Sequence, residues 1–158
     1  MKEEGEVKIS DYLKEDRIVL NLQALKKEDV IKELARLLQE AEEVTDFDLF
    51  LKDIFERETL NTTGIGNHLA IPHARTDAVK EFVLVFGRVP QGLDFNSLDG
   101  KPAKFFFLLG TPKKKGLNTY INTLAHLTRL MNKAAFQEAL LKAPGPKEII
   151  EEFRKIEP

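Results

Sequence analysis

The stretch KFFFLLGT, residues 104–111, is apolar at five consecutive positions, Phe105 to Leu109. A strand with one face in water alternates apolar and polar side chains, whereas a strand covered on both sides can be apolar throughout. The run therefore predicts a strand at the centre of a sheet that has layers on both faces. We expect Phe105, Phe106 and Phe107 to belong to the core of that sheet and not to a ligand site.

Shorter strand patterns lie on the N-terminal side of this run. EFVLVFGRV (81–89) is rich in β-branched and aromatic residues, and Pro-Gln-Gly behind it is typical of a turn. HLAIP (68–72) is compatible with one short strand, and RIVLNL (17–22) with another. These segments bring further strands to the same sheet.

Helical patterns separate and follow the strands. Ser10 is a candidate N-cap for a short helix that ends at Leu13. Apolar side chains recur at three- and four-residue spacings over 26–44 and again from about Asp46 to Glu58. Beyond Asn118, a second candidate cap, one helical stripe is formed by Leu117, Ile121, Leu124, Thr128 and Met131.

Two more helices complete the chain, one ended by APGP (143–146) and one over KEIIEEFRKI (147–156). The alternation of strands and helices predicts an α/β fold with a mixed sheet of roughly five strands flanked by helices. A chain of 158 residues is the size of one ordinary domain. We expect that domain to span residues 9–158, after a polar tail over 1–8.

The composition excludes several classes of function. No cysteine is present, which removes disulfides, thiolate zinc sites and cysteine nucleophiles. The net charge is −2, so no global positive field favours nucleic acid. The N-terminal MKEEGEVKIS lacks the apolar core of a secretory signal, and no stretch is long and apolar enough to span a membrane. We expect a soluble, cytoplasmic protein without direct membrane insertion.

GIGNHLAIPHA, residues 64–74, holds two of the three histidines. Gly64 and Gly66 superficially suggest a dinucleotide-binding loop, but Leu69 occupies the third glycine position and the segment precedes a strand. A tight turn, with glycine used for positive φ or for a close backbone approach, explains the two glycines better. No Walker motif is present.

The sequence also offers few suitable residues for a metal site or for a serine nucleophile. His68, His73 and Asp77 could form a metal-dependent hydrolase site, but a separation of five on one strand sends the two histidines to opposite faces. Ser10 and Ser97 are the only serines, and neither lies in a nucleophile-elbow sequence. Histidine itself therefore becomes the candidate nucleophile.

The Pro72-His73 step favours His73 in this role. Proline fixes φ and ends a strand, so the imidazole that follows is rigidly presented at the edge of a sheet. If a backbone carbonyl binds one ring N–H, the other nitrogen is free to attack a phosphoryl group. Arg57 and Arg75 are both candidates for neutralising phosphoryl oxygens, and the pattern alone does not separate this role from that of an ordinary surface charge.

The stretch RETLNTTGIGNHLAIPHAR (57–75) closely resembles the signature of enzyme IIA domains of the fructose/mannitol type, from the phosphoenolpyruvate-dependent phosphotransferase system, including its nitrogen-regulatory branch. The resemblance extends upstream over residues 9–38 and downstream to LAHLTRLM (124–131). In that family the histidine of the AIPH motif accepts a phosphoryl group from the phosphohistidine of the carrier HPr and passes it to a cysteine of enzyme IIB.

The resemblance implies a role for each matching residue. His73 becomes the phosphoryl acceptor, Arg57 its charge-stabilising neighbour, and Gly64, Gly66 and Asn67 the turn that shapes the pocket. It implies no metal and no organic cofactor. It implies HPr or a nitrogen-branch counterpart as the donor, and enzyme IIB or regulated proteins as recipients.

This chain departs from the family pattern at its second histidine. That position, at the start of the helix after the central strand, falls on Tyr120. Tyr120 can donate a hydrogen bond but cannot carry positive charge at neutral pH. His126 is no simple substitute, because six residues turn a helix by about 600° and leave it roughly 120° from Tyr120. A non-transferring regulatory module that keeps the fold is therefore the alternative function.

Two smaller departures lie near the motif. The family commonly has glycine where this chain has His68, which either compensates for the missing histidine or is structurally incidental. The loop TPKKKG (111–116) carries three lysines, Lys113 to Lys115, that either attract an anionic partner or are simply solvated.

Overall fold

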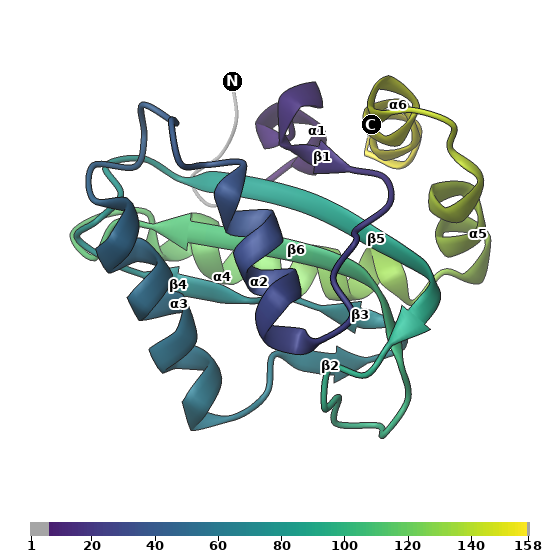
Figure 1. The fold of residues 1–158 in the computed structure, drawn as a ribbon. Coiled ribbons are helices and arrows are strands. Elements are labelled where there is room, and N and C mark those ends of the chain that lie inside the picture. The colour runs from purple at the N-terminus through teal and green to yellow at the C-terminus, as the bar shows by residue number, and fades with distance from the viewer. Residues whose placement is uncertain (1–6, 158) are drawn as a thin grey trace.

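The computed structural model describes residues 7–157, and its central element is strand β6 (Ala103–Thr111) of a six-stranded sheet (Figure 1). β6 pairs with three other strands. Phe105, Phe106 and Phe107 are fully buried in it. The prediction of a central strand covered on both faces is therefore confirmed.

The sheet is mixed, with one strand more than expected. Its spatial order is β1 (Ile18–Val19), β5 (Val83–Leu93), β6, β3 (Leu69–Ala70) and β2 (Gly64–Gly66), with β4 (His73–Arg75) also paired to β6. β1 runs parallel to β5, and β3 and β4 run parallel to β6. The β5–β6 and β2–β3 pairs are antiparallel.

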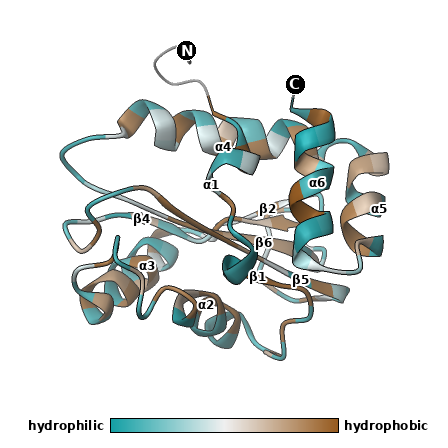
Figure 2. Ribbon diagram, turned by 90° about the horizontal axis from the view of Figure 1, so that it is seen from above, coloured by the Kyte–Doolittle hydropathy of each residue, from teal (hydrophilic) through white to brown (hydrophobic). Residues whose placement is uncertain are grey.

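Helices cover both faces of the sheet, as Figure 2 shows from above. One face is covered by α2 (Lys27–Arg36) and α3 (Phe47–Leu60). The other is covered by α1 (Ile9–Tyr12), α4 (Leu117–Met131), α5 (Ala134–Lys142) and α6 (Pro146–Ile156). Successive side chains of β6 alternate between these two cores, so Phe106 packs with α2 and α3 while Phe107 packs on the opposite face. The predicted α/β architecture is confirmed.

Neither of the two predicted N-caps, Ser10 and Asn118, is the N-cap of its helix. Ser10 lies inside α1, and the amides of Ile9 and Ser10 donate to the carboxylate of Glu157 at 2.6 and 3.0 Å. Asn118 lies inside α4, whose N-cap is Gly116 with φ 79°. Glycine suits this left-handed conformation because it has no Cβ. A short 3-10 turn, η1 (Glu15–Arg17), precedes β1.

Two strand predictions need correction. Pro-Gln-Gly over 90–92 is not a turn, because β5 continues through it to Leu93, with a register shift between Arg88 and Leu93 that absorbs the irregular backbone. HLAIP is not one strand. Asn67 and His68 have φ values of 54° and 69° and form the turn between β2 and β3.

The predicted apolar stripe of α4 does not face the sheet along its whole length. Leu117 and Ile121 are each 51% exposed, and the buried residues of α4 are Thr123, Leu127, Leu130 and Met131. The predicted stripe is therefore divided, because Leu124 packs against the core and Met131 is buried in it, whereas the two N-terminal members are exposed.

The predicted polar tail over 1–8 lies outside the described residues except for Val7 and Lys8. Val7 packs partly buried against the core on the α6 face. None of the helices in the described part of the chain is long and apolar enough to cross a membrane.

Candidate active site around His73

His73 is the first residue of β4 and follows Pro72 directly. Its side chain is buried, and Nδ1 lies 2.6 Å from the carbonyl oxygen of Ile71. A carbonyl oxygen can only accept, so Nδ1 carries the hydrogen and donates it. Nε2 is then left with its lone pair, as a nucleophile or a general base requires.

A chain of buried hydrogen bonds holds the Ile71 carbonyl in place. The Glu58 carboxylate accepts from the Thr63 amide at 2.7 Å and from the Thr63 hydroxyl at 2.6 Å. The Thr63 carbonyl in turn accepts from the Ile71 amide at 3.0 Å. Lys27 pairs with Glu58 at 2.8 Å and balances its charge. The end of α3 is thereby connected to the His73 imidazole through Thr63 and Ile71, which flank β2 and β3.

The surroundings of His73 favour its neutral form. Burial lowers its pKa below the ordinary value of 6.5, and the Arg57 charge lowers it further. The hydrogen bond to Ile71 and the charge of Glu58 act in the opposite direction but do not outweigh burial. The imidazole is therefore uncharged and able to react at neutral pH.

Tyr120 of α4 faces the same side of β4 as His73. Its ring lies 5.3 Å from the His73 ring, in an edge-to-face arrangement. Residues two apart on a strand share a face, and the guanidinium carbon of Arg75 lies 5.7 Å from the Tyr120 ring centre. Burial raises the pKa of the Tyr120 phenol, although Arg57 and Arg75 oppose the shift. Tyr120 thus remains a hydrogen-bond donor at neutral pH.

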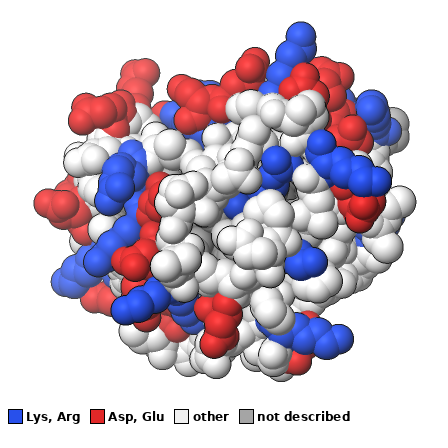
Figure 3. Space-filling view, turned by 45° about the vertical axis from the view of Figure 1, so that its right-hand side comes forward, with Lys and Arg blue, Asp and Glu red and all other residues white. Residues whose placement is uncertain are grey.

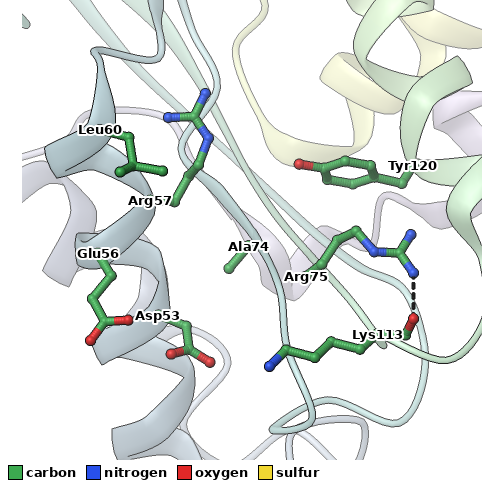
Figure 4. Close-up of a pocket in the computed structure, with 8 residues that line it drawn as sticks. All are labelled: Asp53, Glu56, Arg57, Leu60, Ala74, Arg75, Lys113 and Tyr120. Carbon is green, nitrogen blue, oxygen red and sulfur yellow. Dashed lines mark hydrogen bonds between the residues drawn. The ribbon is translucent and has the colours of Figure 1, made fainter.

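A cavity of about 450 Å³ lies beside His73, lined by Asp53, Glu56, Arg57, Leu60, Ala74, Arg75, Lys113 and Tyr120 (Figure 4). His73 does not line this cavity, but Tyr120, whose ring lies 5.3 Å from the His73 ring, and Arg75, on the same face of β4, both do. The Tyr120 hydroxyl points toward Arg57 across this space (Figure 4). Arg57 is held at the end of α3 by donating to the Asn61 carbonyl at 3.0 Å.

The structure thus brings together His73, Arg57 and Tyr120, but it places the predicted pocket turn elsewhere. Gly64, Gly66 and Asn67 do not line the cavity. The side-chain amide of Asn67 donates from Nδ2 to the Met131 carbonyl at 2.9 Å and so attaches the β2–β3 turn to the end of α4. Gly66 has φ 102°, and a Cβ on Gly64 would lie 2.5 Å from the Ser97 hydroxyl. These residues support the fold of the hairpin and not the cavity wall.

His68 is also not brought to His73. Leu69, the residue after it, pairs with Phe105, whereas His73 pairs with Leu109. Four residues along β6 correspond to about 13 Å. His68 instead contacts Gln137, with Nδ1 at 3.1 Å from the amide oxygen. The two histidines do not lie on opposite faces of one strand, as the sequence suggested. They are far apart because His68 lies in the turn before β3, whereas His73 begins β4.

The remaining histidine and the metal alternative lie outside the site. His126 donates from Nε2 to Glu157 at 2.6 Å, on the side of α4 that meets the chain ends. Among the residues that the structure describes, no group of three or more His, Cys, Asp or Glu side chains could hold a metal ion. The combination of His68, His73 and Asp77 is therefore not assembled.

The lysine loop borders the site without forming a uniform charge. Lys113 lines the cavity, whereas Lys115 pairs with Glu81 at 2.8 Å. On the face drawn in Figure 3, acidic and basic side chains are interspersed, and neither sign forms one large patch. This pattern agrees with the near-zero net charge of the chain.

Exposed apolar side chains lie next to the charged cavity. Leu60 of its wall is 78% exposed, and Leu117 and Ile121 flank Tyr120 on α4. Apolar side chains that gather on a surface beside a reactive group are typical of a docking face for another protein. The helical spacing placed Leu117 and Ile121 on one stripe with Leu124 and Met131, so the sequence did not show that these two are exposed.

Sequence reasoning also missed the support behind His73. Neither the Ile71 carbonyl nor the Glu58–Thr63 pair was identified. The position of Glu58 on the buried side of α3 could have indicated this support, because a buried carboxylate needs hydrogen-bond partners.

Comparison with known proteins connects this geometry to a family. Residues 11–156 match the family model described as "Phosphoenolpyruvate-dependent sugar phosphotransferase system, EIIA 2". The chain is 34% identical over 145 residues to the fructose-specific EIIABC component of Bacillus subtilis, covering 92% of this chain but only 23% of that protein. It is 38% identical over 117 residues to the fructose-specific EIIA component of Haloferax volcanii, covering 74% of this chain and 75% of that one.

Solved structures agree with the sequence relatives. The crystal structure of the nitrogen regulatory protein IIA-Ntr from Neisseria meningitidis has a TM-score of 0.84 at 27% identity, covering 92% of this chain and 98% of that one. Enzyme IIA for mannitol, in complex with phosphorylated enzyme IIB from Escherichia coli, has a TM-score of 0.77 at 21% identity, covering 90% and 97%. The second likeness concerns the fold alone.

Proposed function

Because the chain belongs to the EIIA type 2 family of the phosphoenolpyruvate-dependent sugar phosphotransferase system, whose members are phosphocarriers, we propose that His73 is its phosphoryl acceptor. The donor in this proposal is the phosphohistidine of HPr or of a nitrogen-branch counterpart. The phosphoryl group then passes to a cysteine of enzyme IIB, or its presence on His73 is the signal. We place this activity in the cytoplasm.

The observation that carries the proposal is the hydrogen bond from Nδ1 of His73 to the Ile71 carbonyl. It fixes the tautomer in which Nε2 is the nucleophile, and burial keeps the ring uncharged. Arg57 and the Tyr120 hydroxyl border the adjoining cavity, where three phosphoryl oxygens would need donors.

The transfer step needs no redox partner. Nε2 of His73 attacks the phosphorus atom of the donor's phosphohistidine, and a new N–P bond forms as the donor's N–P bond breaks. The departing donor imidazole keeps the electron pair. Positioning and charge stabilisation supply most of the catalysis in such in-line transfers. In the onward step, the thiolate of the enzyme IIB cysteine attacks the same phosphorus atom, so that a P–S bond forms as the N–P bond to His73 breaks and Nε2 keeps the electron pair.

The partners in this proposal are supported by the relatives and by the surface. The structure of the mannitol enzyme IIA is of a complex with phosphorylated enzyme IIB. In our chain, Leu60 of the cavity wall is exposed, and so are Leu117 and Ile121, which lie beside Tyr120 in the sequence of α4; exposed apolar side chains of this kind suit protein docking. The identity of the sugar, where one is involved, depends on the recipient.

Intact mass spectrometry tests the proposal. The protein is incubated with phosphoenolpyruvate, enzyme I and HPr, or with the nitrogen-branch donors, and its mass is measured at neutral pH. We expect a gain of about 80 Da, one phosphoryl group, that disappears in His73→Ala and persists in the matched control His68→Ala. Labelling of His73→Ala, or no labelling of the wild type by either donor set, would contradict the proposal.

A second candidate function is a regulatory module that binds partners without efficient onward transfer. The specific observation in its favour is Tyr120, a phenol that stays uncharged where the family pattern has a second histidine. The likeness to a nitrogen regulatory protein supports the same alternative. Mixing the phosphorylated chain with enzyme IIB separates the two functions. Loss of the label to the enzyme IIB cysteine supports the carrier, whereas a persistent label with retained partner binding supports the module.

A further inference from the structure

We propose that Arg75 is a direct ligand of the phosphoryl oxygens on phospho-His73, an inference that rests on the proposed function. The pattern of the sequence left Arg75 as one of two undecided arginines, and the family resemblance assigned a role to Arg57 alone. The structure distinguishes Arg75 by one unsatisfied atom.

That atom is Nη1 of Arg75. It is buried and has no hydrogen-bond partner among the described residues, although the neighbouring Nη2 donates to the Lys113 carbonyl at 2.7 Å. A buried donor without an acceptor is costly, and guanidinium groups in proteins normally have partners. In a site that receives an anion, the orphaned N–H indicates where an oxygen of that anion binds.

The position of Arg75 fits a phosphoryl group on His73. The two residues are separated by one residue on β4, so their side chains leave the same face of the strand. Both contact the ring of Tyr120, His73 at 5.3 Å and Arg75 at 5.7 Å. Arg75 also lines the cavity that adjoins His73.

Two contacts hold the guanidinium ready. Nη2 is tied to the Lys113 carbonyl, and the Tyr120 ring provides a face for the cation. In Figure 4 the dashed bond to Lys113 leaves one terminal nitrogen of Arg75, while the other is turned toward the side of Tyr120. Arg57 approaches from α3 on the other side of the cavity, so the two arginines would contact different phosphoryl oxygens.

This arrangement predicts that Arg75 stabilises phospho-His73 more than the unmodified protein. We expect Arg75→Met to be labelled about 10- to 100-fold more slowly than the wild type, the factor associated with loss of one charge-assisted hydrogen bond. Arg75→Lys should recover part of the rate, because it restores the charge but not the forked geometry. Arg154→Met, a change of an exposed arginine on α6, is the matched control and should label normally.

A second measurement separates direct contact from a structural role. In protein labelled with ¹⁵N-arginine, phosphorylation should shift the side-chain resonances of Arg75 strongly, and those of Arg154 not at all. The unfolding midpoint of unphosphorylated Arg75→Met reports any loss of folding.

The possible results separate a failure of the Arg75 assignment from a failure of the proposed function, phosphoryl acceptance by His73. Normal labelling of Arg75→Met, or unshifted Arg75 resonances in the phosphorylated wild type, would overturn the Arg75 assignment and leave His73 as the acceptor. Absence of labelling in the wild type would overturn both.

Discussion

The chemistry of His73 is set by a contact within three residues of backbone. Pro72 lies between Ile71, whose carbonyl accepts the Nδ1 hydrogen at 2.6 Å, and the imidazole that donates it. A local contact of this kind needs no long-range packing to select the tautomer, but burial is needed to keep the ring neutral. The sequence predicted a local carbonyl contact that selects the tautomer, but it did not predict the burial that keeps the ring neutral.

The lowered pKa of His73 predicts the pH dependence of phosphoryl acceptance. A depressed pKa means that more than half of the His73 rings are still unprotonated at pH 6.5. We therefore expect the labelling rate to fall to half of its plateau value only at a pH below 6.5. Rates at several pH values, with the donor kept fully phosphorylated, measure this.

The ¹H resonances of the imidazole provide the control for that profile. Titration of His73 in the unphosphorylated protein should have a midpoint below 6.5. A midpoint above 6.5, or a rate that halves near pH 7, would show that burial does not control this ring.

Tyr120 should contribute through its hydroxyl as well as its ring. Tyr120→Phe keeps the ring that contacts His73 and Arg75 but removes the donor, so we expect labelling to slow by about 10-fold. Tyr120→His introduces a group that can carry positive charge, and we expect it to label faster than the wild type. Stopped-time mass measurements compare the three proteins, and equal rates for the wild type and Tyr120→Phe would assign the tyrosine a packing role only.

At the scale of single residues, the sequence predicted the site unevenly. Arg57 and Tyr120 line one cavity, and the Tyr120 ring lies 5.3 Å from the His73 ring, as their predicted roles require, although those roles remain predictions. Gly64, Gly66 and Asn67 are close in sequence to His73 but belong to a hairpin turn that contacts the end of α4. Adjacency in sequence did not show that the four residues from Leu69 to Pro72, which include β3, carry the chain away from this turn before it reaches His73.

At the scale of elements, the end of α3 supports the site through Glu58. Glu58→Gln removes the partner of Lys27 and weakens the bonds to Thr63, so we expect the free energy of unfolding to fall by about 3 kcal/mol. Urea unfolding measures the change, with an unaltered slope.

A neighbouring glutamate serves as the control for that prediction. Glu56 is exposed and pairs only with Lys52 at 3.8 Å, so Glu56→Gln should change the stability by less than about 0.5 kcal/mol. Similar losses in the two variants would mean that the buried Glu58 network adds nothing to the fold.

A helix or strand could be predicted where its segment carried a single clear pattern of apolar residues. Five consecutive apolar residues identified β6 as central, and the helical spacing identified α2 and α3. In α4 the spacing predicted one apolar stripe, but only its C-terminal part packs on the sheet. Leu117 and Ile121, at its N-terminal end, are exposed, and the spacing alone does not show how far the contact with the sheet extends.

At the scale of the whole molecule, the two ends of the described chain are joined by Glu157. Its carboxylate accepts from the amides of Ile9 and Ser10, 148 and 147 residues away, and from His126 of α4. Burial alone would raise the pKa of Glu157, but these hydrogen bonds outweigh it and leave the pKa below the ordinary 4.5. No local pattern encodes a contact of this separation, and Ser10 was consequently mistaken for the cap.

Glu157→Gln should destabilise the protein by about 2 kcal/mol at pH 7, since charge-assisted bonds to α1 and His126 are weakened. Because the folded pKa is depressed, the contribution of Glu157 is complete above pH 4.5 and is lost as the pH falls through the lower folded value. The stability difference between wild type and variant should therefore shrink on acidification. Urea unfolding at pH 7 and near pH 3 measures it, with the exposed Glu151→Gln as control. A difference that grows toward low pH would contradict this assignment.

The central claim is that His73 reacts through Nε2, because Nδ1 is committed to the Ile71 carbonyl. The most direct test is a long-range ¹H–¹⁵N correlation spectrum of the phosphorylated, ¹⁵N-histidine-labelled protein, with ³¹P coupling used to identify the bonded nitrogen. We predict coupling to Nε2 of His73. Coupling to Nδ1, or to a nitrogen of His68 or His126, would contradict the claim.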